Sequence, residues 1–107
     1  MSNFRYMRMM VMFDLPVETA SERRAYRQFV KFLKENGFIL FQESIYVKLS
    51  MNSSNVALTQ KALKDHLPAK GIVSLMTVTE KQFQDIDYLL GEFQSDVVST
   101  ASKVVEL

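Results

Sequence analysis

The sequence predicts an α+β domain in which an antiparallel sheet carries two helices on one face. Three observations support this class. An apolar stretch at residues 7–13 has the character of a buried strand, amphipathic helical patterns follow at residues 19–37 and 52–68, and strand-like segments lie between and after them. A chain of 107 residues has the length of one domain.

The composition is that of an ordinary globular protein, with 48% apolar and 23% charged residues. The 13 lysines and arginines nearly balance the 12 acidic residues, so net charge alone predicts no partner. Because there is no cysteine, disulfides, thiolate metal sites and cysteine nucleophiles are excluded. No window holds the roughly 18 consecutive apolar residues of a spanning helix, and Arg5 and Arg8 interrupt the start in a way that secretory signals do not. We therefore expect a cytoplasmic protein with no membrane partner.

The first strand delivers a carboxylate to its end. Residues 7–13 are apolar apart from Arg8, which is the pattern of a strand buried on both faces. Pro16 lacks an N–H and pushes Leu15 toward extended geometry, so the ladder should stop near Asp14. A carboxylate at the end of a central strand is a candidate for catalysis or ion binding. The alternative is that Asp14 only bonds backbone amides in the turn before the next helix.

The first helix has clear start and stop signals. Thr19 and Glu22 fit a capping box, and Gly37 supplies the residue that adopts the left-handed conformation after a helix. Apolar residues at helical spacing form one arc of this helix: Ala25, Tyr26, Phe29, Phe32 and Leu33. Five cations lie on the opposite arc and are called the basic stripe below: Arg23, Arg24, Arg27, Lys31 and Lys34.

The basic stripe has two interpretations. Like charges one turn apart repel by a few tenths of a kcal/mol. A phosphate backbone would turn this cost into affinity by releasing counterions, and guanidinium groups bind phosphate oxygens with two hydrogen bonds. The alternative is a solvated helix face without a partner.

Two short strands are predicted next, at residues 38–41 and 45–49. The residues between them lack the glycine or proline of a tight hairpin, so we predict a bend or bulge there. Gln42 and Ser44 in this bend are possible cleft residues that would position water; the alternative is that they form its exposed side.

The remaining elements follow in order. Asn52 can cap the second helix, which the pattern carries to Pro68 with the single histidine, His66, in its last turn. A structural role for His66 is favoured over catalysis, and zinc is not expected because no second histidine or cysteine is present. Residues 72–79 predict a strand and residues 79–82 a helical turn anchored by Phe83. Residues 86–90 predict one more short strand.

The order strand, helix, two strands, helix, strand is that of a ferredoxin-like βαββαβ sandwich, here with an extra C-terminal strand. Such a sheet leaves one face uncovered. Because residues 7–13 are apolar on both faces, we predict a homodimer packed sheet on sheet. The chain divides into a domain at residues 1–91 and a C-terminal tail at residues 92–107.

These residues resemble the CRISPR-associated Cas-two family, in the variant that accompanies type II systems. The resemblance extends from about residue 4 to Leu90. It is carried by the order and spacing of short motifs, each of them weak alone: residues 8–16, the helix segment 26–33, Gly37-Phe38, residues 42–46 and residues 77–83.

The resemblance implies a ferredoxin-like homodimer in the spacer-acquisition machinery of bacterial adaptive immunity. In that family the dimer sits between two dimers of the CRISPR integrase and holds the DNA to be inserted. Members are also described as metal-dependent endonucleases acting on RNA or DNA, with the first-strand aspartate as the magnesium ligand. That aspartate corresponds to Asp14. The last strand typically pairs with the other protomer, which fits residues 86–90.

Two alternatives to an endonuclease stay open. One is a structural, non-catalytic scaffold that grips the phosphates of duplex DNA with the basic stripe, assisted more weakly by Arg5 and Arg8. We expect little sequence preference, because no base-reading helix motif is present. A further alternative is a regulatory module that binds a small ligand at a dimer interface, which the fold alone does not exclude. The motif near Asp14 contains no histidine or lysine suited to act as a general base.

Overall fold

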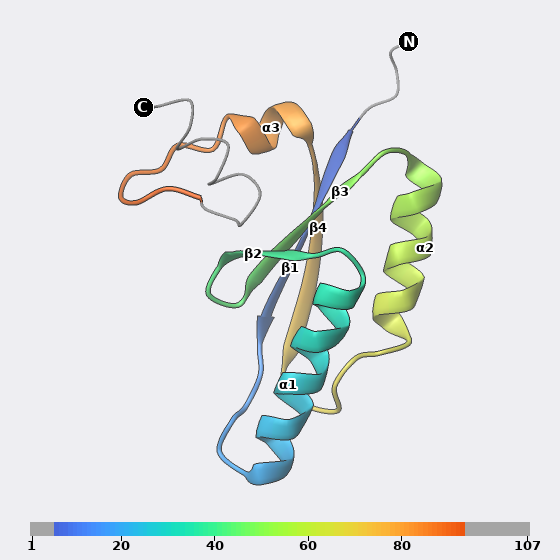
Figure 1. Ribbon diagram of the computed structural model, residues 1–107, viewed down its shortest axis with the longest axis vertical. Helices are drawn as coiled ribbons and strands as arrows, with labels where there is room; N and C mark the ends of the chain where they lie inside the picture. The colour runs from blue at the N-terminus through green and yellow to red at the C-terminus, as the bar shows by residue number, and fades with distance from the viewer. Residues whose placement is uncertain (1–5, 94–107) are drawn as a thin grey trace.

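The computed structural model describes residues 6–93, in which two long helices pack on one face of a four-stranded antiparallel sheet (Figure 1). The strand order is β2-β3-β1-β4, so β1 lies between β3 and β4. This arrangement confirms the predicted ferredoxin-like α+β fold. The elements are β1 Met7–Asp14, α1 Ala20–Glu35, β2 Ile39–Gln42, β3 Ile45–Ser50, α2 Ser53–Lys64, β4 Ile72–Thr79 and α3 Glu80–Gln84.

Strand β1 is buried on both faces, as its apolar run predicts. Alternate residues point to opposite sides of the sheet. Met9, Val11 and Phe13 join the core beneath α1 and α2, whereas Met10 packs on the other face with Phe83 of α3. The central strand therefore connects the two apolar layers.

The predicted helix caps are confirmed. The Thr19 side chain accepts a hydrogen bond from the Glu22 amide, and the Glu22 side chain accepts one from the Thr19 amide. Together they form the capping box. Gly37 follows α1 at a φ of 90°. The Asn52 side chain caps α2, which ends at Lys64 rather than continuing to Pro68.

The connection between β2 and β3 is tighter than predicted. Gln42 pairs with Ile45, which leaves Glu43 and Ser44 as a two-residue turn. The pairing also has a register shift between Leu40 and Gln42, so an irregularity is present but lies within β2, just before the residues where a bend or bulge is predicted. Ser44 takes the left-handed conformation that glycine usually supplies in such a turn, at a φ of 66°. Because residues 42–44 contain neither glycine nor proline, the sequence does not signal a tight hairpin.

The predicted extra strand at residues 86–90 is wrong for the single chain. These residues have no ladder hydrogen bonds, and Leu89 and Leu90 are 90% and 96% exposed. Ile86 and Phe93 instead pack by their side chains on the sheet face opposite α1 and α2. A strand forms only beside an unpaired strand edge with which it can exchange backbone hydrogen bonds. Within residues 6–93, no such edge pairs with residues 86–90. Residues 94–107 of the predicted tail, and Arg5, lie outside the described residues.

In Figure 1 the segment after α3 lies on the side of the sheet away from α2. It covers only part of that face, since Met76 and Ile72 of β4 remain 45% and 65% exposed. Within residues 6–93 no helix is long and apolar enough to cross a membrane.

Candidate functional site

Asp14 is the last residue of β1 and its side chain is exposed. It pairs with Ile72 of β4, and the Phe13 amide just before it donates to the Ser44 carbonyl at 3.0 Å. Leu15, the next residue, is buried in the core beneath the helices. The carboxylate therefore projects from a strand end whose backbone is held on both sides, as expected for a candidate catalytic group.

One chain supplies few ligands for a metal. No group of three His, Asp or Glu side chains with metal-binding geometry occurs among residues 6–93. Magnesium nevertheless tolerates such a site, because it retains several waters and takes one or two carboxylates plus substrate phosphates. The exposed Asp14 carboxylate fits that oxygen-based chemistry, provided that the other ligands come from outside the chain.

The two predicted cleft residues lie in different surroundings. The turn places Ser44 beside the end of β1 through the hydrogen bond from Phe13. Gln42 lines a hollow of about 220 Å³ that also involves Phe41 and Tyr88. Ser44 therefore lies at the Asp14 end of β1, whereas Gln42 lines a separate hollow.

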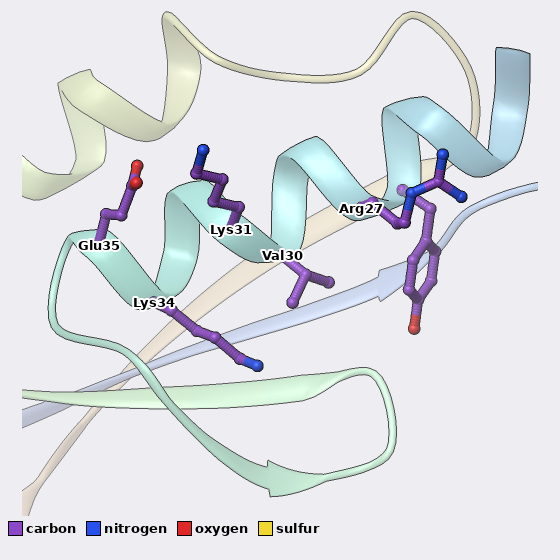
Figure 2. A pocket seen from close by; sticks show the side chains of 6 residues that line it. Arg27, Val30, Lys31, Lys34 and Glu35 are labelled. Carbon is purple, nitrogen blue, oxygen red and sulfur yellow. The ribbon is translucent and has the colours of Figure 1, made fainter.

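The basic stripe is exposed along its whole length. Figure 2 shows Arg27, Lys31 and Lys34 projecting from successive turns of α1, where they line a shallow hollow of about 480 Å³. Within residues 6–93, these three and Arg24 have no acidic side chain at ion-pair distance. Four cations on one helix face therefore have no ion-pair partner in the part of the chain that the structure describes, although Glu35 lines the same hollow.

Arg23 belongs to the stripe in sequence but is partly engaged. Its guanidinium Nη1 donates to the carbonyls of Val17 and Glu18 at 3.1 and 2.8 Å. Arg23 thus helps to hold the loop between β1 and α1, and retains only part of its donors for an external phosphate.

Arg8, which the sequence suggests as a weaker addition to the phosphate-binding surface, is engaged in an ion pair within the fold. Its guanidinium forms a bidentate ion pair with Glu80, with oxygens at 2.6 and 3.2 Å, and lies 4.4 Å from the centre of the Phe83 ring. This hydrogen bonding lowers the pKa of the Glu80 carboxyl below its ordinary value. Because the partners are 72 residues apart, no local pattern signals the pair.

His66 has the structural role that was favoured. It follows the end of α2, and its Nδ1 lies 2.8 Å from the Ala62 carbonyl. The imidazole stacks on Phe32 of α1 with ring centres 4.2 Å apart. His66 thus joins the two helices on the side of the sheet that they cover.

The βαββαβ order and the four-stranded antiparallel sheet define a ferredoxin-like protein, with an exposed aspartate at the end of its first strand and a cationic first helix. The chain belongs to the family described as CRISPR associated protein Cas2, whose sequence profile matches residues 7–86. The resemblance seen in the sequence motifs is thereby confirmed.

Several relatives match over nearly their whole length. A protein of Streptococcus mutans serotype c is 49% identical over 102 residues, which cover 94% of this chain and 93% of the relative. One from Ligilactobacillus salivarius is 43% identical over 101 residues, covering 94% and 100%. One from Treponema denticola is 39% identical over 101 residues, with the same coverage. Each is named a CRISPR-associated endoribonuclease Cas2.

Proposed function

We propose that this protein is a CRISPR-associated endonuclease that hydrolyses phosphodiester bonds of RNA or DNA, with Asp14 as its metal-ligating residue. The observation that carries the proposal is the exposed carboxylate at the end of the central strand β1. The names of the relatives make RNA the first substrate to test.

The proposed cofactor is magnesium or another divalent cation. A second copy of the chain would supply a second Asp14, so that a two-fold homodimer offers two carboxylates where one chain offers one. When bound, such an ion polarises a phosphoryl oxygen and lowers the pKa of a coordinated water. The part played by this chain is to hold the carboxylate at a rigid strand end, with the remaining oxygens supplied by substrate and solvent.

The first experiment compares magnesium-dependent cleavage of RNA and duplex DNA by wild type, Asp14→Ala and Asp14→Asn across pH. Loss of a metal ligand worth several kcal/mol should reduce cleavage by at least about 100-fold. Asp65→Asn is the matched control, because Asp65 is an exposed carboxylate at the end of α2 that pairs with Lys61. Equal cleavage by wild type and the Asp14 variants would assign the activity to a contaminant.

We also propose that the homodimer takes part in spacer acquisition and holds duplex DNA between the CRISPR integrase subunits. The basic stripe supports this role, because its uncompensated cations follow one exposed helix face. Such contacts neutralise phosphates whatever the sequence and release counterions. In the alternative form of this proposal, the protein is a purely structural scaffold without turnover.

The stripe is tested by measuring duplex DNA affinity as a function of salt for the double variant Arg27→Glu, Lys31→Glu. Affinity should fall, and the slope of log K against log salt should decrease by about one for each lost phosphate contact. Lys64→Glu, a charge reversal at an exposed position of α2, should leave the slope unchanged. A double variant with the wild-type slope would remove the stripe from the proposal.

The two roles separate in the Asp14→Asn variant. If it loses cleavage but still binds DNA and assembles with the integrase, the holding role is independent of hydrolysis. If wild type itself does not cleave but binds with a steep salt dependence, the scaffold alternative is correct.

A further inference from the structure

Two residues with a positive φ flank the end of β1, and each lies immediately before one of the two strands that pair with β1. Ser44 precedes β3 at a φ of 66°, and Gly71 precedes β4 at a φ of 99°. Within residues 6–93, Ser44 is the one residue other than glycine with a positive φ. Both turns therefore meet β1 at its Asp14 end.

Ser44 holds the backbone from the β3 side. Its carbonyl accepts the Phe13 amide at 3.0 Å, which continues the pairing of β1 with β3 beyond Ile45. The Phe13 ring is buried, with Phe29 edge-on at 5.4 Å and Tyr46 stacked at 5.9 Å between ring centres. The residue before Asp14 is thus fixed by both its amide and its side chain.

Gly71 confines the backbone from the β4 side. A Cβ at this position would lie 2.6 Å from the Asp14 carbonyl oxygen and 2.8 Å from the Leu15 side chain. Only glycine permits this approach and the positive φ together. The peptide after Asp14 is therefore packed against the backbone of Gly71.

A serine at a positive φ is disfavoured relative to glycine or asparagine, and such strained residues concentrate at functional sites. Within residues 6–93 no side-chain hydrogen bond explains why a serine occupies this left-handed position. The Ser44 carbonyl, by contrast, accepts the hydrogen bond from the Phe13 amide. We propose that Ser44 is a positioning residue for Asp14. Its left-handed backbone holds the Phe13 amide on one side of the strand end, while the backbone of Gly71 packs against the Asp14 carbonyl on the other. This inference rests on the proposed function of Asp14.

The geometry has a direct consequence for hydrolysis. A displacement of about 1 Å at a reacting group can reduce a rate by about 100-fold. If Ser44 leaves the left-handed region, the hydrogen bond from the Phe13 amide to the Ser44 carbonyl is lost. The end of β1 that carries Asp14 is then no longer held on the β3 side. Cleavage should therefore depend on the backbone conformation of residue 44 and not on its hydroxyl group.

Two substitutions at Ser44 separate these roles. Ser44→Gly removes the hydroxyl and favours the positive φ, whereas Ser44→Thr keeps a hydroxyl but adds a β-branch that opposes it. Assayed below the melting temperature of both variants, Ser44→Gly should cleave within about twofold of wild type and Ser44→Thr at least about tenfold more slowly. In the same samples, amide hydrogen exchange of Phe13 should be unchanged by glycine and faster with threonine.

The opposite pattern, with Ser44→Thr active and Ser44→Gly inactive, would assign the role to the hydroxyl and overturn the inference. Wild-type cleavage and wild-type Phe13 exchange in both variants would overturn it as well. If wild type shows no Asp14-dependent cleavage, the proposed function fails separately. Faster Phe13 exchange together with a shifted Asp14 amide resonance, in Ser44→Thr alone, would then still support the positioning role, and their absence would refute it.

Discussion

At the scale of single residues, the contact between Arg8 and Glu80 shows how a charge can be removed from the functional surface. The side chains of the pair are 14% and 27% exposed. The carboxylate also accepts a hydrogen bond from Gln84, and Phe83 beside it is buried against the sheet. The pair therefore joins α3 to the start of β1, and two of the Arg8 guanidinium nitrogens are committed to this contact within the fold.

Replacing Glu80 by glutamine should destabilise the protein by about 1 to 2 kcal/mol at neutral pH, since a charged hydrogen bond is lost. The folded-state pKa of Glu80 is lowered, chiefly by the Arg8 hydrogen bonds. Its contribution is therefore complete above the ordinary carboxyl range near pH 4 and is lost as pH falls through the lower folded-state value. Denaturant unfolding from pH 7 to pH 3 should show the difference between wild type and Glu80→Gln shrinking with acidification.

The matched control for this prediction is Glu43→Gln in the exposed turn, which should leave the free energy of unfolding at neutral pH unchanged. A difference between wild type and Glu80→Gln that stays constant across the pH range would show that the ion pair is not its source.

At the scale of elements, α1 combines a stabilising face with a destabilising one. Phe29 and Leu33 are 2% and 0% exposed beneath the helix, whereas the basic stripe repels itself on the outside. Arg27 has Arg23 and Lys31 four residues away on either side and Arg24 three residues before it. Each such like-charge pair opposes helix formation by a few tenths of a kcal/mol.

Arg27→Glu should consequently stabilise the protein while weakening its binding to DNA. The substitution turns three repulsive neighbours into attractive ones, for a gain of about 0.5 to 1 kcal/mol. Thermal unfolding at low salt measures the first effect and DNA binding measures the second. A variant that is less stable than wild type would show that Arg27 contributes to the fold instead of to a ligand surface.

At the scale of the whole molecule, the sheet face opposite α1 and α2 is the part that one chain leaves incomplete. Met76 lies opposite Met10 in the ladder between β1 and β4. Met10 is buried beneath Phe83, yet Met76 is 45% exposed. Apolar side chains on one face of a central sheet fit the proposed sheet-on-sheet homodimer.

Met76→Asp should convert the homodimer to a monomer without unfolding it, because a carboxylate in the interface loses its hydration while the side chain is already half exposed in one chain. Sedimentation velocity measures the mass, and circular dichroism reports the fold. Leu58→Asp is the control, since Leu58 is 68% exposed on α2. A dimeric Met76→Asp variant would place the interface elsewhere.

Much of the fold could be predicted because its signals are local. The apolar run of β1, the capping box at Thr19 and the glycine after α1 each specify a structure within a few residues. The same holds for the candidate site. Asp14 at a strand end and the charge periodicity of α1 follow from the order of residues alone, so the sequence predicts both.

Which of these groups remain available to a ligand depends on contacts that form only when the chain folds. The tertiary structure paired Arg8 with Glu80, engaged Arg23 with the preceding loop and left residues 86–90 without a strand partner. It also placed Ser44 and Gly71 on either side of the Asp14 strand end. The physical reason is that the Arg8 pair and the placement of Ser44 and Gly71 depend on groups far apart in the chain, and a strand at residues 86–90 needs an edge beside it. The Arg23 contact is more local, but it depends on how the loop before α1 folds back on the helix. Periodicity and capping describe only the nearest turns of backbone.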